Sequence, residues 1–444
     1  MRNIASYVLA LVLLAVLLMT GACRKDPSGQ EGALMNANVM LLYSCGYNNL
    51  SSALKADIKD VLKSRIPYYY ERGSYRFMVF SQLSKTSYDW KTPVEPTLVE
   101  YYKDIEGGVC SDTLMRCPAT DVAASAVVMN KVLEYVKELV PDGRYGMIFS
   151  SHSTGWLPLG WTGKANDEIE WMSVTSQSGD SLQQGASGQS GVTSQQGVSS
   201  QPQSSYAFLT AEHDTKTIGA HFVETSTVSR EIEFVDFAAA IPEDMHLQYL
   251  VMDACLAGGI EIAYEIKDKV DYYVASQTEI LSDGFPYGRM TSRLLFCIRP
   301  DVKGLADDFY HLYADSSSSC TISVVDCRHL EALADVCGGL FEKHRSEMDA
   351  INPSTVQLYF RYNWHWFYDL KDILAHCSLS PEEEGALDSA LASAVIYKNA
   401  TPRAFGIDMS RHCGLSMFLP CNGSAALKDI YRGYAWNRSS GLVK

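Results

Sequence analysis

Residues 247–264 have the sequence LQYLVMDACLAGGIEIAY, which combines an apolar run, a short turn with Cys255 and two glycines, and a segment with helical spacing of apolar residues. The apolar run predicts a strand that is buried on both faces, and the last segment predicts a helix that covers the sheet. A buried strand that leads through a turn into a helix is typical of α/β folds.

The same alternation recurs on both sides of this stretch. Further buried strands are predicted over 38–44, 75–81, 145–150, 270–275, 321–325 and 415–419. A helix is predicted through Leu54, Ile58 and Val61, and another over about 121–140, with Asp121 as its N-terminal cap. The chain is therefore predicted to be an α/β protein, a three-layer αβα sandwich around a mostly parallel sheet.

The composition excludes several classes of protein. The chain has 444 residues, of which 47% are hydrophobic, and a formal net charge of −15. This apolar content is too high for a disordered chain, and no glycine or proline period indicates a fibre. The acidic balance and the lack of a basic stripe argue against nucleic acid as the main partner.

The N-terminal residues 1–22 are interpreted as an export signal rather than as part of the fold. Arg2 precedes an apolar run over 7–19, which is shorter than the roughly 20 residues that span a bilayer. The small residues before Cys23 resemble a bacterial lipobox, in which that cysteine carries the lipid and 23–36 form a polar tether. We expect an exported protein anchored by lipid in the cell envelope; an ordinary cleaved signal peptide is the alternative.

A low-complexity stretch interrupts the α/β pattern. Residues 173–205 contain 11 serines, 8 glutamines and 5 glycines, and they include no lysine or arginine. Such a segment cannot bury enough apolar surface to offset the entropy of ordering it. It is interpreted as a disordered insertion within one domain, because the strand–helix pattern resumes after it; a domain boundary at this place is the alternative.

Two side chains follow predicted strands at the edge where α/β sheets bind ligands. His152 comes directly after the strand over 145–150, and Cys255 follows the strand over 247–252. A nearby imidazole can activate a thiol and protonate a leaving amine, and a helix N-terminus beside Cys255 would favour its thiolate. The structural alternative is that Cys255 is a small core residue and His152 a histidine with structural hydrogen bonds.

With these residues the chain resembles the clostripain family of cysteine endopeptidases, which share a caspase-like fold with legumains and gingipains. The resemblance spans about 37–440, outside the low-complexity insertion. It rests on His152-x-x-Gly155-Trp156, Asp253-Ala-Cys255, Tyr273-Val-Ala-Ser-Gln277, Asp283-Gly-Phe-Pro-Tyr287, Asn48-Asn49-Leu50 and Gly414-Leu-Ser-Met-Phe-Leu-Pro420. It implies a caspase-like core over 37–300, with 301–444 completing the same domain.

The resemblance implies a role for each matching residue. Cys255 would be the nucleophile and His152 the general acid/base, and the backbone N–H groups of Ser153 and Cys255 would form the oxyanion hole. Family members cleave after arginine or lysine, and Asp253 and Asp283 match the acids of their S1 pocket, which a buried cation needs as partners. A helix cap for Asp253 and an Asp-Gly turn for Asp283 are the structural alternatives.

The chain also departs from the family pattern. Ser153 stands where the family usually has glycine, and Ala257 where it often has methionine. These departures leave open a catalytically inactive surface lipoprotein that binds protein or peptide ligands. Family members often mature by self-cleavage between the histidine and the cysteine, and in that interval Lys164, Lys216 and Arg230 are the basic residues that a self-cleaving enzyme would use.

The remaining cysteines and histidines give weaker signals. Without Cys23 the chain has 11 cysteines, so at least one thiol is unpaired if the others form disulfides. The cysteines and histidines between 320 and 344 have no zinc-ligand spacing, so no metal site is expected there. We expect that the chemistry requires no cofactor. Only the family resemblance suggests that Ca²⁺ could be needed.

Overall fold

The structure is a computed structural model that describes residues 37–86, 89, 91–158, 218–221, 230–360 and 366–444. The predicted signal peptide, Cys23 with its tether, and the insertion over 173–205 lie outside the described residues. Within the described part, no helix has the length and apolar character needed to cross a membrane.

The fold is built on one sheet of nine strands. In chain order they are β1 (Asn38–Gly46), β2 (Tyr75–Leu83), β3 (Thr97–Lys103), β4 (Val109–Arg116), β5 (Arg144–Ser150), β8 (Leu247–Asp253), β9 (Val270–Ala275), β10 (Thr321–Asp326) and β12 (Val395–Ala400). Their spatial order is β12-β10-β9-β8-β5-β1-β2-β3-β4. The five central strands from β9 to β2 are parallel, as predicted, whereas the two strands at each edge pair antiparallel.

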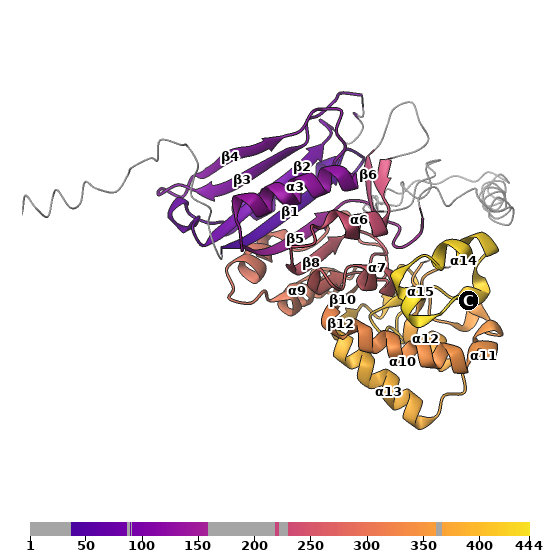
Figure 1. The fold of residues 1–444 in the computed structure, drawn as a ribbon. Coiled ribbons are helices and arrows are strands. Elements are labelled where there is room, and N and C mark those ends of the chain that lie inside the picture. The colour runs from indigo at the N-terminus through magenta and orange to yellow at the C-terminus, as the bar shows by residue number, and fades with distance from the viewer. Residues whose placement is uncertain (1–36, 87–88, 90, 159–217, 222–229, 361–365) are drawn as a thin grey trace, which may run out of the picture.

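The central strands are buried on both faces, which explains their nearly continuous apolar sequences. In β1, Val39 and Leu41 belong to one apolar core and Met40 and Leu42 to a second core on the opposite face. The helices that cover the first face are α3 (Ala126–Leu139), α6 (Phe234–Ala240) and α7 (Ile260–Glu265); those on the second are α2 (Ser51–Lys63), α8 (Tyr287–Met290) and α9 (Val302–Ala314). This arrangement confirms the predicted three-layer sandwich (Figure 1).

The last third of the chain adds strands to the same sheet and a group of helices beside it. Strands β10 and β12 extend the sheet beyond β9. The helices are α10 (Leu330–Lys343), α11 (Arg345–Asp349), α12 (Leu370–Ala375), α13 (Pro381–Ala394), α14 (Ala425–Tyr431) and α15 (Ala435–Ser440). The strand predicted over 415–419 is not part of the large sheet, because β15 (Ser416–Met417) pairs with β11 (Tyr368–Asp369) in a small sheet of its own.

One helix begins later than predicted. The helix expected over 121–140 starts at Ala126, and its cap is Ser125, whose hydroxyl accepts a hydrogen bond from the Val128 N–H at 3.3 Å. Asp121 instead donates its backbone N–H to the Pro118 carbonyl in the preceding turn. Both residues are good N-caps, so the choice between them depends on where the turn after β4 ends.

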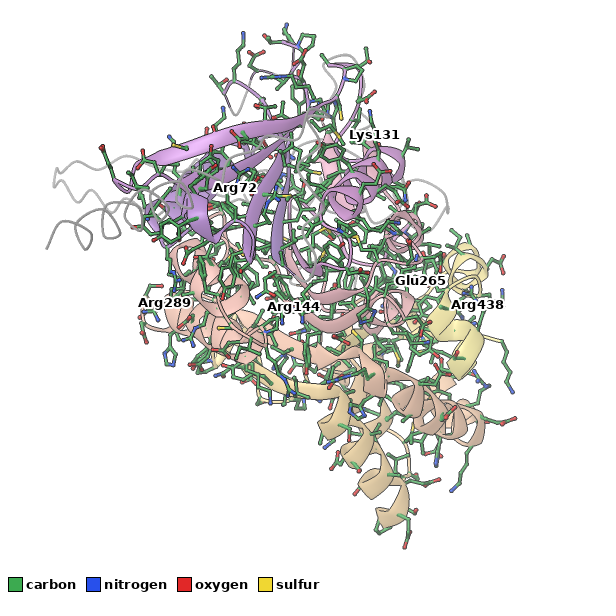
Figure 2. All side chains as sticks on the ribbon, turned by 60° about the vertical axis from the view of Figure 1, so that its left-hand side comes forward. Arg72, Lys131, Arg144, Glu265, Arg289 and Arg438 are labelled. Carbon is green, nitrogen blue, oxygen red and sulfur yellow. The ribbon has the colours of Figure 1, made fainter. Side chains whose placement is uncertain are left out.

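Side chains fill the space between the sheet and its helices, while labelled charged residues such as Arg289 and Arg438 lie towards the outside (Figure 2). None of the eleven described cysteines forms a disulfide, and seven of them are buried. The seven buried cysteines therefore act as small apolar core residues, whereas Cys110, Cys255, Cys297 and Cys421 are partly exposed.

Candidate active site

A cavity at the carboxyl ends of β5 and β8 brings the two predicted reactive side chains together. His152 follows β5 and Cys255 follows β8, and both line this cavity. The two strands are neighbours with parallel pairing that places Ser150 opposite Asp253. Helix α2 and the segment over 279–284 form the remaining walls.

The histidine turn is held from several sides. His152 is only 6% exposed, and its Nε2 lies 2.6 Å from Oδ1 of Asn49, which follows β1. Because a carboxamide oxygen accepts hydrogen bonds, Nε2 carries the proton in this contact and Nδ1 is the basic nitrogen. Trp156 in the same turn is fully buried against Phe418 and Tyr431 near the C-terminus.

The cysteine turn is compact and strained. Leu256 has a φ of +57°, a backbone conformation that is uncommon for residues other than glycine and that often occurs at functional sites. Its N–H donates to the Thr278 carbonyl at 2.9 Å. A Cβ at Gly155 would lie 2.5 Å from the Leu256 carbonyl oxygen, so glycine is required where the two turns meet.

Both reactive groups are neutral in this arrangement. Burial raises the pKa of the Cys255 thiol to about 12, although the Ile280 N–H lies 3.3 Å from its sulfur and acts in the opposite direction. Burial also lowers the pKa of His152 to about 3. Helix α7 begins only at Ile260, so its N-terminus does not adjoin Cys255, and burial opposes the thiolate that the sequence suggested.

Ser153, the departure from the family pattern, is accommodated within its own turn. Its hydroxyl accepts a hydrogen bond from the Gly155 N–H at 3.0 Å, and the residue is 4% exposed. The added side chain is thus folded back onto the turn, which is a common arrangement for serine in turns.

Asp253 supplies a buried carboxylate to the cavity. It is 7% exposed, and its Oδ2 accepts hydrogen bonds from the hydroxyls of Ser150 at 2.9 Å and Tyr287 at 2.6 Å. Burial raises the pKa of Asp253 above its usual range, while the two hydroxyls act against this shift. The sequence-based alternative of a helix cap does not fit, because α7 begins seven residues later at Ile260, with Gly259 as its N-cap.

Asp283 lies differently from what the sequence suggested, and Asp57 adds a carboxyl group that the sequence analysis did not name. Asp283 is exposed beside the cavity, whereas its neighbours Ser282 and Gly284 line it. Asp57, on the buried face of α2, lines the cavity and is 7% exposed. Burial and the nearby negative charges of Asp253, Asp60 and Asp283 raise the pKa of Asp57 far above its usual range.

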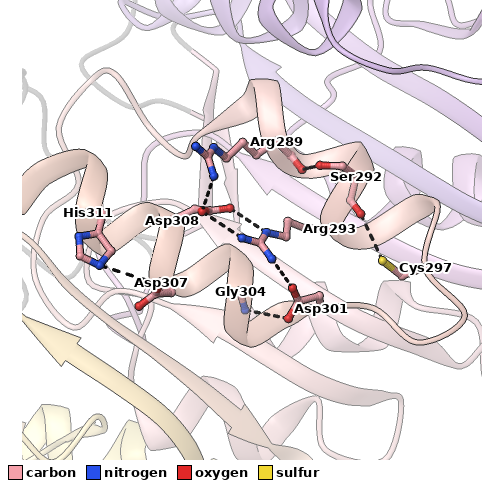
Figure 3. Close-up of polar contacts among 9 residues, drawn as sticks. All are labelled: Arg289, Ser292, Arg293, Cys297, Asp301, Gly304, Asp307, Asp308 and His311. Atoms are coloured by element: carbon pink, nitrogen blue, oxygen red, sulfur yellow. Dashed lines mark hydrogen bonds and ion pairs between the residues drawn. The ribbon is translucent and has the colours of Figure 1, made fainter.

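A network of ion pairs holds the wall that carries Tyr287. The π-helical turn Thr291–Leu295 directly follows α8, and Arg293 in this turn donates to Asp308 at 2.8 Å and to Asp301 at 2.6 Å (Figure 3). Asp301 also caps α9 by accepting from the Gly304 N–H. Tyr287, and through it Asp253, is thereby fixed to the rest of the second helical layer.

Of the three predicted self-cleavage residues, the structure describes only the backbone of Arg230. Lys164 and Lys216 lie outside the described residues. Arg230 begins β7 (Arg230–Ile232), whose backbone pairs with β6 (Ile218–His221). A protease that cuts after Arg230 would therefore have to separate this strand pair first.

Three contributors to the site had no role in the sequence analysis. Asn49 and Tyr287 are in motifs that carry the family resemblance, but nothing in the sequence assigned them a partner. For Asp57 a signal existed: it follows Leu54 by three residues and precedes Val61 by four, so a carboxylate lies on the apolar face of a helix. Within the described residues, no group of three or more histidine, cysteine or acidic side chains could hold a metal ion.

A family model described as the clostripain family matches residues 209–440 of this chain. The matched range contains Cys255, Asp253 and Asp283, whereas His152 precedes it. No curated protein matches the chain.

Several solved structures share this fold. An inactive zymogen C11 protease from Parabacteroides distasonis is 22% identical, with a TM-score of 0.67 over 91% of this chain and 98% of that one. A secreted C11 cysteine protease from Bacteroides thetaiotaomicron is 18% identical, with a TM-score of 0.65 over 91% and 100%. A structure described as such a protease with an irreversible peptide inhibitor has 18% identity and a TM-score of 0.67 over 91% and 99%. At these identities the likeness establishes the fold.

Proposed function

The chain belongs to the clostripain family of cysteine peptidases, and from this membership we propose that it is an endopeptidase that hydrolyses peptide bonds after arginine or lysine. The observation that carries this proposal is the cavity shared by Cys255, His152 and the buried carboxylate of Asp253. Histidine is the cavity's only basic side chain, since no lysine or arginine is present among the described lining residues.

In the proposed mechanism, the Cys255 sulfur attacks the carbonyl carbon of the P1 residue while Nδ1 of His152 takes the thiol proton. His152 then gives this proton to the leaving amine, and a thioester remains on Cys255. Water, deprotonated by His152, attacks the thioester carbonyl; the thiolate leaves and recovers the proton. Burial favours the neutral thiol and the neutral imidazole, and we therefore infer that the proton transfer accompanies the attack.

The negative oxygen that develops on the substrate carbonyl needs donors fixed in advance. We assign this task to the backbone N–H groups of Ser153 and Cys255, which belong to the two turns that meet at Gly155 and Leu256. Backbone donors that are held rigidly cost no reorganisation when the charge develops. The strained Leu256 and the glycine at 155 favour such rigidity.

The basic side chain of the P1 residue would bind against Asp253. A cation that leaves water for a buried pocket needs a charged, hydrogen-bonded partner there. Asp253 has this character because Ser150 and Tyr287 hold one of its oxygens in place. The resemblance also assigns Asp283 to the pocket; its exposed position supports a smaller, longer-range contribution.

The contact between Asn49 and His152 leads to a prediction for a positioning residue. Replacing Asn49 with alanine should lower kcat about 10- to 100-fold with little change in KM, because the imidazole loses the acceptor that fixes its tautomer and orientation. Steady-state kinetics with one basic peptide would measure this.

Asn49→Asp is the matched variant, since it keeps an acceptor for Nε2. It should recover much of the rate and move the acid limb of the pH profile upward, because a carboxylate raises the pKa of the imidazole. An alanine variant with unchanged kcat would show that Asn49 does not position the histidine.

The proposed function is tested with fluorogenic peptides that end in Arg, Lys, Asp, Asn or Leu, under reducing conditions. Cleavage after Arg and Lys alone is the expected result. Cleavage after another residue would keep the cysteine peptidase and contradict the role of the acidic pocket.

The second candidate is a catalytically silent protein that binds peptides or proteins at the same cavity. The observation that favours it is the burial of both reactive groups, which stabilises the unreactive thiol. A folded protein that cleaves no peptide in the panel, and whose Cys255 resists alkylation, would support this candidate.

A further inference from the structure

Asp57 has a buried carboxyl group for which the fold shows no structural role. It lies in the middle of α2, where the backbone N–H groups are used within the helix, so it cannot act as a cap. It is 7% exposed, and its Oδ2 is buried without a hydrogen-bond partner among the described residues. Two lysines of the same helix contact other groups: Lys55 donates to the Ser84 carbonyl and Lys63 to Asp60.

Such a group is costly unless something binds it. An unpaired buried carboxyl destabilises the fold through lost hydration, and a protein would normally replace it with an apolar residue at this position of a helix. Asp57 nevertheless faces the cavity that contains Asp253 and Cys255. The unsatisfied oxygen therefore points to a cationic ligand that enters the cavity.

We propose that Asp57 is a specificity-determining residue that binds the P1 side chain together with Asp253 and makes the enzyme prefer arginine to lysine. The inference rests on the proposed function and adds to it a residue from a different wall of the pocket. Asp253 lies at the end of a strand, while Asp57 comes from helix α2.

The preference for arginine follows from the number and spread of the donors. A guanidinium has five N–H donors in a planar fork and can bond to carboxylates on two walls at once. An ammonium is a compact charge that one carboxylate and neighbouring hydroxyl groups satisfy. Loss of Asp57 should therefore affect arginine more than lysine, whereas loss of Asp253 should affect both.

The test measures kcat/KM for two peptides that differ only in P1 Arg or Lys, in wild type, Asp57→Asn and Asp57→Ser. We expect the value for arginine to fall about 10- to 100-fold and that for lysine less than about 5-fold. The matched control is Asp60→Asn, which replaces the same side chain at an exposed position of the same helix outside the cavity lining and should change the ratio less than about twofold.

The ratio of kcat/KM for the arginine peptide to that for the lysine peptide is measured in one preparation. Partial unfolding of a variant lowers both values equally and therefore does not change their ratio. An equal fall for both peptides, or no fall, in a variant of an active enzyme would overturn the role of Asp57 and leave the proposed function standing. A wild-type protein that cleaves neither peptide would contradict the proposed function, and this inference with it.

Discussion

Replacing Cys255 with alanine should lower kcat for a peptide with P1 arginine by about 10⁴-fold or more, because the covalent route is lost. The substitution keeps the Cβ and removes only the sulfur, which is hydrogen-bonded to the backbone of Ile280. The fold should therefore be retained, and the circular dichroism spectrum should match that of the wild type. Kinetics with a fluorogenic peptide would measure the loss.

Two further variants make this experiment specific. Cys110→Ala changes a partly exposed cysteine on the edge strand β4 and should leave kcat unchanged. His152→Ala should be impaired to a degree similar to Cys255→Ala, because groups that act as a unit are not additive. Activity that survives in the Cys255 variant would mean that another residue is the nucleophile.

Replacing Asp253 with asparagine should lower kcat/KM for basic peptides by about 100- to 1,000-fold, which is the usual cost of leaving a buried charge without its partner. Asparagine is nearly isosteric, and its carbonyl oxygen can still accept from Ser150 and Tyr287. Its NH₂ group would then face the entering cation, which makes the loss severe. A peptide with P1 leucine would serve as the reference substrate.

A substitution of Asp283 is the control for the predicted effect of Asp253→Asn. Because Asp283 is exposed, Asp283→Asn should change kcat/KM less than about fivefold, as expected for a screened charge at the surface. A loss as large as that for Asp253→Asn would instead support equal roles for the two acids.

The pH dependence of KM gives a further prediction for Asp253. Because burial raises the pKa of Asp253, its carboxylate is protonated at a higher pH than an ordinary aspartate. As the pH is lowered, KM for basic peptides should therefore begin to increase above the normal titration range of aspartate.

The centre of the fold was predictable because its sequence has one interpretation. Strands such as β1 and β8 are apolar on both faces, which only a covered parallel sheet explains. The edge strands β3 and β4 were not predicted, since β4 alternates between exposed and half-buried residues and has no continuous apolar run. Its place in the sheet is determined by antiparallel pairing with β3, which the sequence does not mark.

The candidate site was predictable where it follows strand ends. His152 and Cys255 come directly after β5 and β8, and the carboxyl edge of a parallel sheet brings such residues together. Asn49 reaches His152 from the turn after β1, and Asp57 reaches the cavity from α2. Their positions depend on how that helix packs on the sheet, and this is set by contacts between residues far apart in the chain.

Because β5 pairs directly with β8, the site should tolerate changes in the segment that connects these two strands. The distance between the histidine turn and the cysteine turn is set by hydrogen bonds between two neighbouring strands, not by the roughly one hundred residues that connect them. A connection of almost any length or composition is therefore compatible with the same site geometry. Because β5 and β8 are paired directly, a chain cut between residues 158 and 218 should remain one particle made of two polypeptides.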